Sequence, residues 1–151
     1  MTAKENNLKQ FVDGCLEGIY KIGTVSTTKG QDNMHDRGWQ LTKAAQKEFE
    51  QVVSEWFERN YKDLCRLAAF GDSFYAFGCW FICSVQGCGT GFFDAHLGIP
   101  ADEVRNKLKR LGNKLHKSVQ SSFQSNEVFN LYIVRGKHCA FEFPLVTNAS
   151  V

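Results

Sequence analysis

One uncharged stretch, SFYAFGCWFICSVQGCGTGFF at residues 73–93, constrains the fold of this chain more than any other feature. It begins as an apolar and aromatic run and ends with three alternating glycines, Gly87, Gly89 and Gly91. A membrane-spanning helix needs about 20 mainly apolar residues. The apolar part here, residues 74–85, is shorter than that and is followed by glycines. The sequence therefore favours a segment buried in a protein core, with no membrane partner.

A short continuous apolar run is typical of a strand that is buried on both faces of a sheet. We therefore predict a strand from residue 74, a glycine turn at 86–90 and a second strand at 91–94. Together these segments would form a hairpin over residues 74–94.

Apolar residues at helical spacing predict helices at 8–22, 40–67 and 100–123. The polar residues 23–38 should form a loop, and a turn at Arg135-Gly136-Lys137 predicts a second hairpin over 128–143. The whole chain, 1–151, is thus predicted to be a single α+β domain. Its helical N-terminal half would span residues 5–70, and about three helices would pack on a three- to four-stranded antiparallel sheet.

The N-terminal sequence MTAKENNLKQ has no apolar signal segment. The six cysteines are then expected to be free thiols in a reducing compartment, and we expect a cytoplasmic protein in a host bacterial cell. Formal charge is unevenly placed: residues 1–70 carry 10 basic and 10 acidic side chains, whereas residues 100–151 carry 8 basic and 4 acidic ones. An electrostatic partner should therefore contact the C-terminal third.

The third predicted helix carries six cations and no acidic residue after Glu103. These are Arg105, Lys107, Lys109, Arg110, Lys114 and Lys117. On a helical wheel they cover about half of the circumference. This spread favours a solvated basic face, and a surface for nucleic acid or for an acidic protein is the alternative. Six aromatic residues gather near the predicted helix–strand junction: Trp39, Trp56, Phe70, Phe74, Tyr75 and Phe77. Core packing explains most of them, and the remainder could form a partner or dimer surface.

The glycine cluster has two interpretations. Backbone N–H groups of Gly87, Cys88, Gly89 and Gly91 could hold a phosphate, but a phosphate loop normally leads into a helix. The predicted strand after Gly91 instead favours a simple turn, and Asp94 is expected to cap it.

The sequence gives little indication of a metal site or of catalytic residues. Cys79, Cys83 and Cys88 with His96 lack the paired short spacings of a structural zinc site. Cysteine–histidine pairs and paired carboxylates also fail to form a coherent constellation, so we expect neither a metal, nor a cofactor, nor enzymatic activity.

The residues QGCGTGFFDAHLG at 86–98 resemble the signature DFWLTRNGHGAGFWDRGLG of a family of small bacteriophage and mobile-element proteins. The three glycines, Phe92, Asp94, Leu97 and Gly98 match it, and Leu131-Tyr132 matches its closing strand. The resemblance covers about 60 residues and implies a shared fold and a phage or mobile-element origin. No activity is established for that family.

This chain departs from the family signature at its polar positions. Trp80 replaces Asp, Val85 replaces Arg, Cys88 replaces His and Ala95 replaces Arg, so no active site carries over. We therefore expect a non-catalytic protein that binds a host protein stoichiometrically, for example a component of an antiviral defence system such as CRISPR. The alternatives are a nucleotide or anion binder, and a nucleic-acid-binding protein that uses the basic helix at 101–118.

Overall fold

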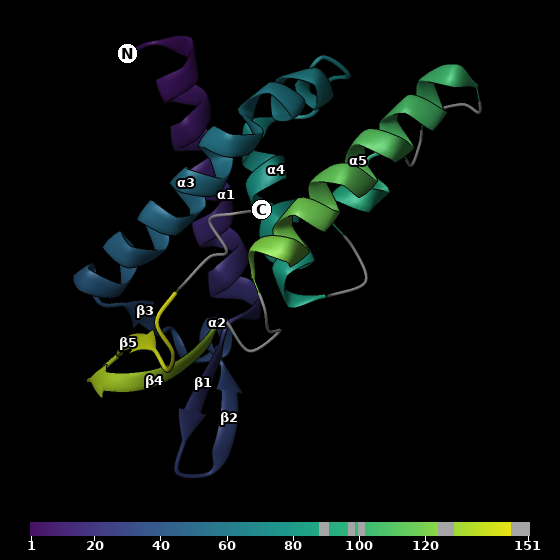
Figure 1. Cartoon of the computed structure of the whole chain (residues 1–151). Helices are drawn as coiled ribbons and strands as arrows, with labels where there is room; N and C mark the ends of the chain where they lie inside the picture. Colours follow the sequence, from purple (N-terminus) through teal and green to yellow (C-terminus); the bar gives the residue numbers. More distant parts are fainter. Residues whose placement is uncertain (88–90, 97–98, 100–101, 124–128, 146–151) are drawn as a thin grey trace.

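The structure is a computed structural model that describes residues 1–87, 91–96, 99, 102–123 and 129–145, with the backbone alone at residues 36 and 37. It has an α+β fold in which a small sheet lies at one end of a group of helices (Figure 1). The predicted fold class is therefore confirmed at this level, although the sheet differs from the predicted one.

All three predicted helices are present, with ends shifted by a few residues. α1 (Ala3–Ile22) starts at Thr2, whose side chain accepts the N–H of Glu5 while the Glu5 carboxylate accepts the N–H of Thr2. α3 (Lys43–Ala68) starts three residues later than predicted, because Gln40–Leu41 forms a short strand and Thr42 caps the helix. α5 (Glu103–Ser122) corresponds to the third predicted helix.

The predicted hairpin at 74–94 is wrong. Residues Phe74–Gln86 form a helix, α4, and Phe92–Asp94 form a single 3-10 turn, η1. Ser73 begins α4 by accepting the N–H of Ala76, and Gly87 ends it in the left-handed conformation. A uniformly apolar run does not distinguish a buried strand from a buried helix, and the caps at both ends determine the outcome here.

α4 packs against α1 at unusually short range. A Cβ atom added to Gly14 would lie 2.0 Å from the carbonyl oxygen of Tyr75, and one added to Gly78 would lie 2.2 Å from that of Phe11. The two backbones therefore touch at this crossing, and only glycine fits at either position.

The sheet has five strands in the order β2-β1-β4-β5-β3. The strands are β1 (Thr24–Thr27), β2 (Gly30–Asn33), β3 (Gln40–Leu41), β4 (Asn130–Arg135) and β5 (His138–Phe141). β1–β2 and β4–β5 are antiparallel, whereas β1–β4 and β3–β5 are parallel, so the predicted antiparallel sheet of three or four strands is wrong. The predicted C-terminal hairpin is confirmed as β4–β5.

Two of the unpredicted strands come from the region predicted as a loop, and β3 replaces the start of the helix predicted at 40–67. Residues 23–38 contain β1, β2 and a short helix, α2 (Met34–Arg37). β1 is too polar to be identified as a strand on its own, and it forms through pairing with β4, more than 100 residues away in the chain. Long-range pairing of this kind leaves little local sequence signal.

Aromatic rings fill the space between the helices. Phe11 stacks on Trp56 and meets Phe57 and Phe81, so α1, α3 and α4 share one cluster. Of the aromatic residues predicted near the helix–strand junction, Trp39, Trp56, Phe74 and Phe77 are buried, and only Phe70 and Tyr75 are exposed. Among the described residues, no helix combines the length and apolar character that crossing a membrane requires.

Candidate functional site

Most of the predicted site residues lie on α5, where they form a basic surface. Asp102 starts the helix by accepting the N–H groups of Val104 and Arg105. Leu108, Leu115 and Val119 are buried on one side, which turns the opposite side to solvent. α5 runs alongside α3 at the outside of the helical group (Figure 1).

The six predicted cations do not occupy equivalent positions. Lys107, Lys109, Arg110, Lys114 and Lys117 are exposed, whereas Arg105 is half-buried. At 100° per residue, Lys107, Arg110, Lys114 and Lys117 fall within about 80° of each other and form a row about 15 Å long. We call these four residues the cationic row. All six cations were predicted to share one broad face, and this row was not distinguished from its flanks.

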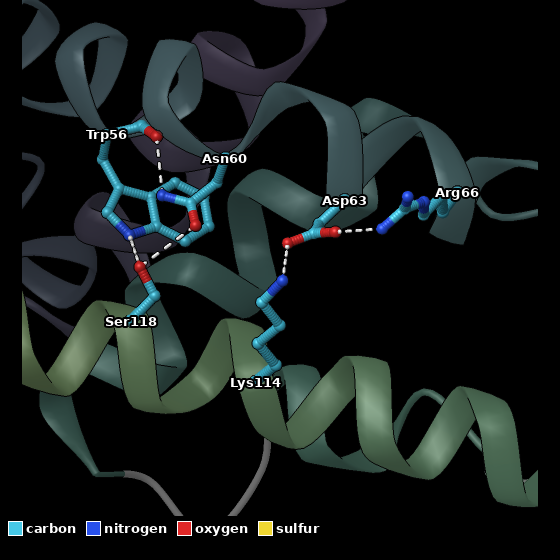
Figure 2. Close-up of polar contacts among 6 residues, drawn as sticks. All are labelled: Trp56, Asn60, Asp63, Arg66, Lys114 and Ser118. Carbon is cyan, nitrogen blue, oxygen red and sulfur yellow. Dashed lines mark hydrogen bonds and ion pairs between the residues drawn. The ribbon is translucent and has the colours of Figure 1, made fainter.

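Lys114 has a partner within the chain. Its Nζ lies 2.9 Å from Oδ2 of Asp63 on α3, and Arg66 Nη1 lies 3.0 Å from Oδ1 of the same carboxylate (Figure 2). Asp63 is buried while both cations remain largely exposed. Lys114 thus joins α5 to α3, and in the described part of the chain no ion pair involves the other three residues of the row.

A second polar contact orients α5 against α3. Trp56 Nε1 donates to Ser118 Oγ at 3.2 Å, and the Ser118 hydroxyl donates to Asn60 Oδ1 at 3.1 Å (Figure 2). Asn60 in turn donates to the Trp56 carbonyl oxygen. Sequence reasoning missed this network, because nothing local to Ser118 indicates which residue of α3 it will face.

Formal charge is unevenly distributed between α5 and the rest of the chain. α5 and its cap carry six of the 18 basic residues and only two of the 16 acidic ones, Asp102 and Glu103. This segment therefore has a formal charge of +4, and the rest of the chain has −2. An anionic partner would be oriented toward α5 by this asymmetry.

The two described glycines of this segment, Gly87 and Gly91, lie at turns. Gly91 has φ +146°, and its N–H donates to Asp94 Oδ2 at 3.2 Å, so Asp94 caps this turn as predicted. Gly87 is the C-cap of α4. Cys88 and Gly89 lie outside the described residues. In the described part of the chain, Gly91 leads into a turn of only three residues, η1, which gives no extended helix N-terminus for a phosphate.

Ser84, His116 and Asp94 come together under this segment. His116 Nδ1 lies 3.0 Å from Ser84 Oγ, which also accepts the N–H of Phe92 at 3.4 Å. Ser84 is fully buried. Burial lowers the pKa of His116, and the nearby Asp94 carboxylate opposes part of that shift. The three residue types resemble a hydrolytic triad, but the buried hydroxyl has no access to a substrate, so the contact joins α4, η1 and α5.

Two cysteines that were predicted to lie in a strand lie on a helix. Cys79 and Cys83 are half-buried on helix α4 and do not lie in a strand. Burial raises the pKa of the Cys79 thiol, which lies 3.5 Å from the Gly14 carbonyl oxygen. His96 has a buried Nδ1 with no hydrogen-bond partner among the described residues. Within those residues, no group of three or more potential ligands could hold a metal ion.

Comparisons with protein-family models, with curated proteins and with solved structures find no significant match to this chain. The resemblance to the phage-protein signature therefore stays a prediction.

Proposed function

We propose that this chain is a non-catalytic binding protein that uses the cationic row of α5 to hold an acidic surface of a host protein. The resemblance to phage proteins suggests that the host protein belongs to an antiviral defence system. The proposal rests on one observation above all, which is the row of like charges on the solvent side of α5.

This row works against the stability of its own helix. Lys107–Arg110 and Lys114–Lys117 are spaced i,i+3, and Arg110–Lys114 is spaced i,i+4, so each pair of neighbours repels by a few tenths of a kcal/mol. Arg105, in the first turn, is also unfavourable at the positive end of the helix dipole. A helix selected only for solubility would alternate the two signs of charge. The arrangement therefore supports a role in binding an anion.

The buried state of Ser84 and the raised pKa of the thiols of Cys15 and Cys79 also favour binding over catalysis. A nucleophile must be accessible and activated, and a thiol acts through its thiolate. None of these three groups meets both conditions.

Nucleic acid is the second candidate partner. Asn106 and Gln120 are exposed and Asn113 is half-buried on α5. Their spacing places them beside the cationic row, where amide groups could donate hydrogen bonds to phosphate oxygens.

The test is a charge reversal with a matched control. The site variant combines Lys107→Glu, Arg110→Glu and Lys117→Glu, and the control combines Lys9→Glu, Lys47→Glu and Lys62→Glu, which are exposed on α1 and α3. Both change the net charge equally. We expect wild type and control to capture one dominant protein from host lysate, identified by mass spectrometry, and the site variant to lose it.

The same proteins are then titrated with duplex DNA and with RNA at rising salt. If nucleic acid is the partner, affinity should fall steeply with salt, and the site variant should have a smaller slope. Capture that is equal for the site variant and the wild type would refute a role for α5.

A further inference from the structure

Two hollows lie on either side of Thr42, where α3 begins beside the β4–β5 hairpin. This region is at the sheet end of the molecule, away from the exposed face of α5 (Figure 1). The hollows have volumes of about 350 and 380 Å³, within the range of small-molecule sites. Both contain Thr42 in their lining, so they adjoin each other.

The first hollow is basic. Its lining consists of Thr42, Lys43, Val134, Arg135 and His138. The three basic side chains come from α3, β4 and β5, and none of the described lining residues is acidic. In the part of the chain that the structure describes, none of the three forms an ion pair. The first-turn N–H groups of α3 add positive potential at the same place, because they have no intrahelical acceptor.

An irregularity in the hairpin brings Arg135 into this hollow. The β4–β5 register is Ile133 opposite Cys139, then Arg135 opposite His138, so Val134 is an extra residue on β4. In a regular strand, Val134 and Arg135 would point to opposite faces. The bulge lets both line the hollow with His138, and bulges commonly redirect a side chain in this way beside functional sites.

The second hollow is aromatic and has hydrogen-bond acceptors. Tyr132 and Phe143, which are 45% and 54% exposed, line it together with Ala140 and Pro144. The carboxylates of Glu48 and Glu142 also line it. Glu48 accepts the N–H of Leu145, and Glu142 accepts the hydroxyl of Ser26, so both carboxylates are held in place. Exposed rings beside fixed acceptors suit a flat heteroaromatic group that carries N–H donors.

We propose that the two hollows together form a binding site for a nucleotide. The phosphate groups lie in the basic hollow, against Lys43, Arg135 and His138, and the base stacks on Tyr132 in the aromatic hollow. Tyr132 and Arg135 are three residues apart on β4, a distance of about 10 Å, which a nucleoside diphosphate can span. The site shares no residue with the cationic row, so it stands independently of the function proposed for α5.

The chemistry of the lining excludes simpler ligands. A bare phosphate would leave Tyr132 and Phe143 uncovered, and an uncharged aromatic molecule would leave Lys43 and Arg135 without a partner. An acidic ligand without a flat ring would meet the two carboxylates of the aromatic hollow at a cost from like-charge repulsion. A nucleotide has phosphate groups that suit the basic hollow and a base that suits the aromatic hollow.

The test uses isothermal titration of the full chain with ADP, GDP, CDP and UDP, and separately with adenosine and with inorganic phosphate as probes of the two halves. At least one nucleotide should bind more tightly than adenosine or phosphate. Arg135→Gln should weaken nucleotide binding tenfold or more and leave adenosine binding unchanged. Tyr132→Ala should weaken nucleotide and adenosine binding and leave phosphate binding unchanged.

Lys47→Gln is the matched control, because Lys47 is exposed about one turn further along α3 and lines neither hollow. It should bind as the wild type does. Circular dichroism confirms that each variant is folded. The proposal is overturned if no nucleotide binds at millimolar concentration, or if Arg135→Gln and Tyr132→Ala bind no differently from Lys47→Gln. Retained nucleotide binding in the α5 charge-reversal variant would confirm that the two sites are separate.

Discussion

Ser84 is the single residue at which α4, η1 and α5 are connected through one hydroxyl group. Its oxygen accepts the N–H of Phe92, and its hydroxyl lies 3.0 Å from His116 Nδ1, to which it can donate its proton. That arrangement requires a neutral imidazole with its proton on Nε2. Protonation of His116 would place a second donor against the same hydroxyl and remove this acceptor.

We therefore predict that acid destabilises the fold through His116. Its pKa is lowered in the folded state, so the unfolded chain, with a pKa of about 6.5, takes up the proton more readily. The contribution of the neutral ring is fully present above that value and declines as the pH falls below it. Urea unfolding near pH 7.5 and near pH 5.5 measures the difference. His116→Gln should have a smaller loss of unfolding free energy between the two, and an equal loss would contradict the prediction.

Residue type alone identified the cations of α5 and the capping role of Asp94, but the sequence could not assign their partners. The link between Lys114 and Asp63 depends on how α3 and α5 are placed in space, and these residues are 51 positions apart in the chain. Arg105, Lys107 and Lys109 have the same formal charge as Lys114 and no comparable contact in the described structure. Local sequence holds no signal that separates them.

At the scale of elements, α4 shows what a sequence pattern can leave undecided. Five residues of α4 are buried at helical spacing, namely Phe74, Phe77, Phe81, Ile82 and Val85. Cys79 and Trp80 lie between them and are also apolar, so the helical period cannot be recognised in the sequence. The motif Gly14-x-x-x-Gly18 on α1 was the available signal. It indicates a helix face open to close packing: Gly14 meets the backbone of Tyr75, and Gly18 meets the side chain of Ile82.

Gly14→Ala tests that crossing. In an open helix this substitution stabilises by up to about 1 kcal/mol. Here the new Cβ would lie 2.0 Å from the Tyr75 carbonyl oxygen, so α1 and α4 must separate, and we expect a loss of about 1–3 kcal/mol instead. Urea denaturation measures the change, with the exposed neighbour Asp13→Ala as the control. A stabilised Gly14→Ala protein would show that the two helices are not in contact there.

The contact between α3 and α5 makes a second prediction at this scale. Ser118→Ala leaves the buried indole N–H of Trp56 without an acceptor, at a cost of about 1–3 kcal/mol. Trp56→Phe in the same protein removes the donor as well, so the two substitutions together should cost less than the sum of the single ones. Gln120→Ala, exposed on the same helix, serves as the control. Additive losses would indicate that Ser118 and Trp56 act independently.

At the scale of the whole molecule, helices and sheet are joined by segments distant in sequence. β1 follows α1 directly, yet it pairs with β4, which follows α5, so the sheet joins segments from the two ends of the chain. Phe49 of α3 stacks on Phe141 of β5, which continues the aromatic core into the sheet. This continuity predicts that the helices and the sheet unfold as one cooperative unit.

Two cysteines report on this prediction, one from the helices and one from the sheet. Cys15 lies on α1 and Cys139 on β5, and both are fully buried. Burial also raises the pKa of each thiol, so neither reacts in the native state except through opening of the structure. Exposed Cys65 should be alkylated at once in native buffer. When alkylation is followed by mass spectrometry across a urea series, Cys15 and Cys139 should lose protection at the same urea concentration. Loss of protection at Cys139 at a lower urea concentration than at Cys15 would mean that the sheet opens without the helices. The proposed nucleotide site would then belong to the less stable part of the fold.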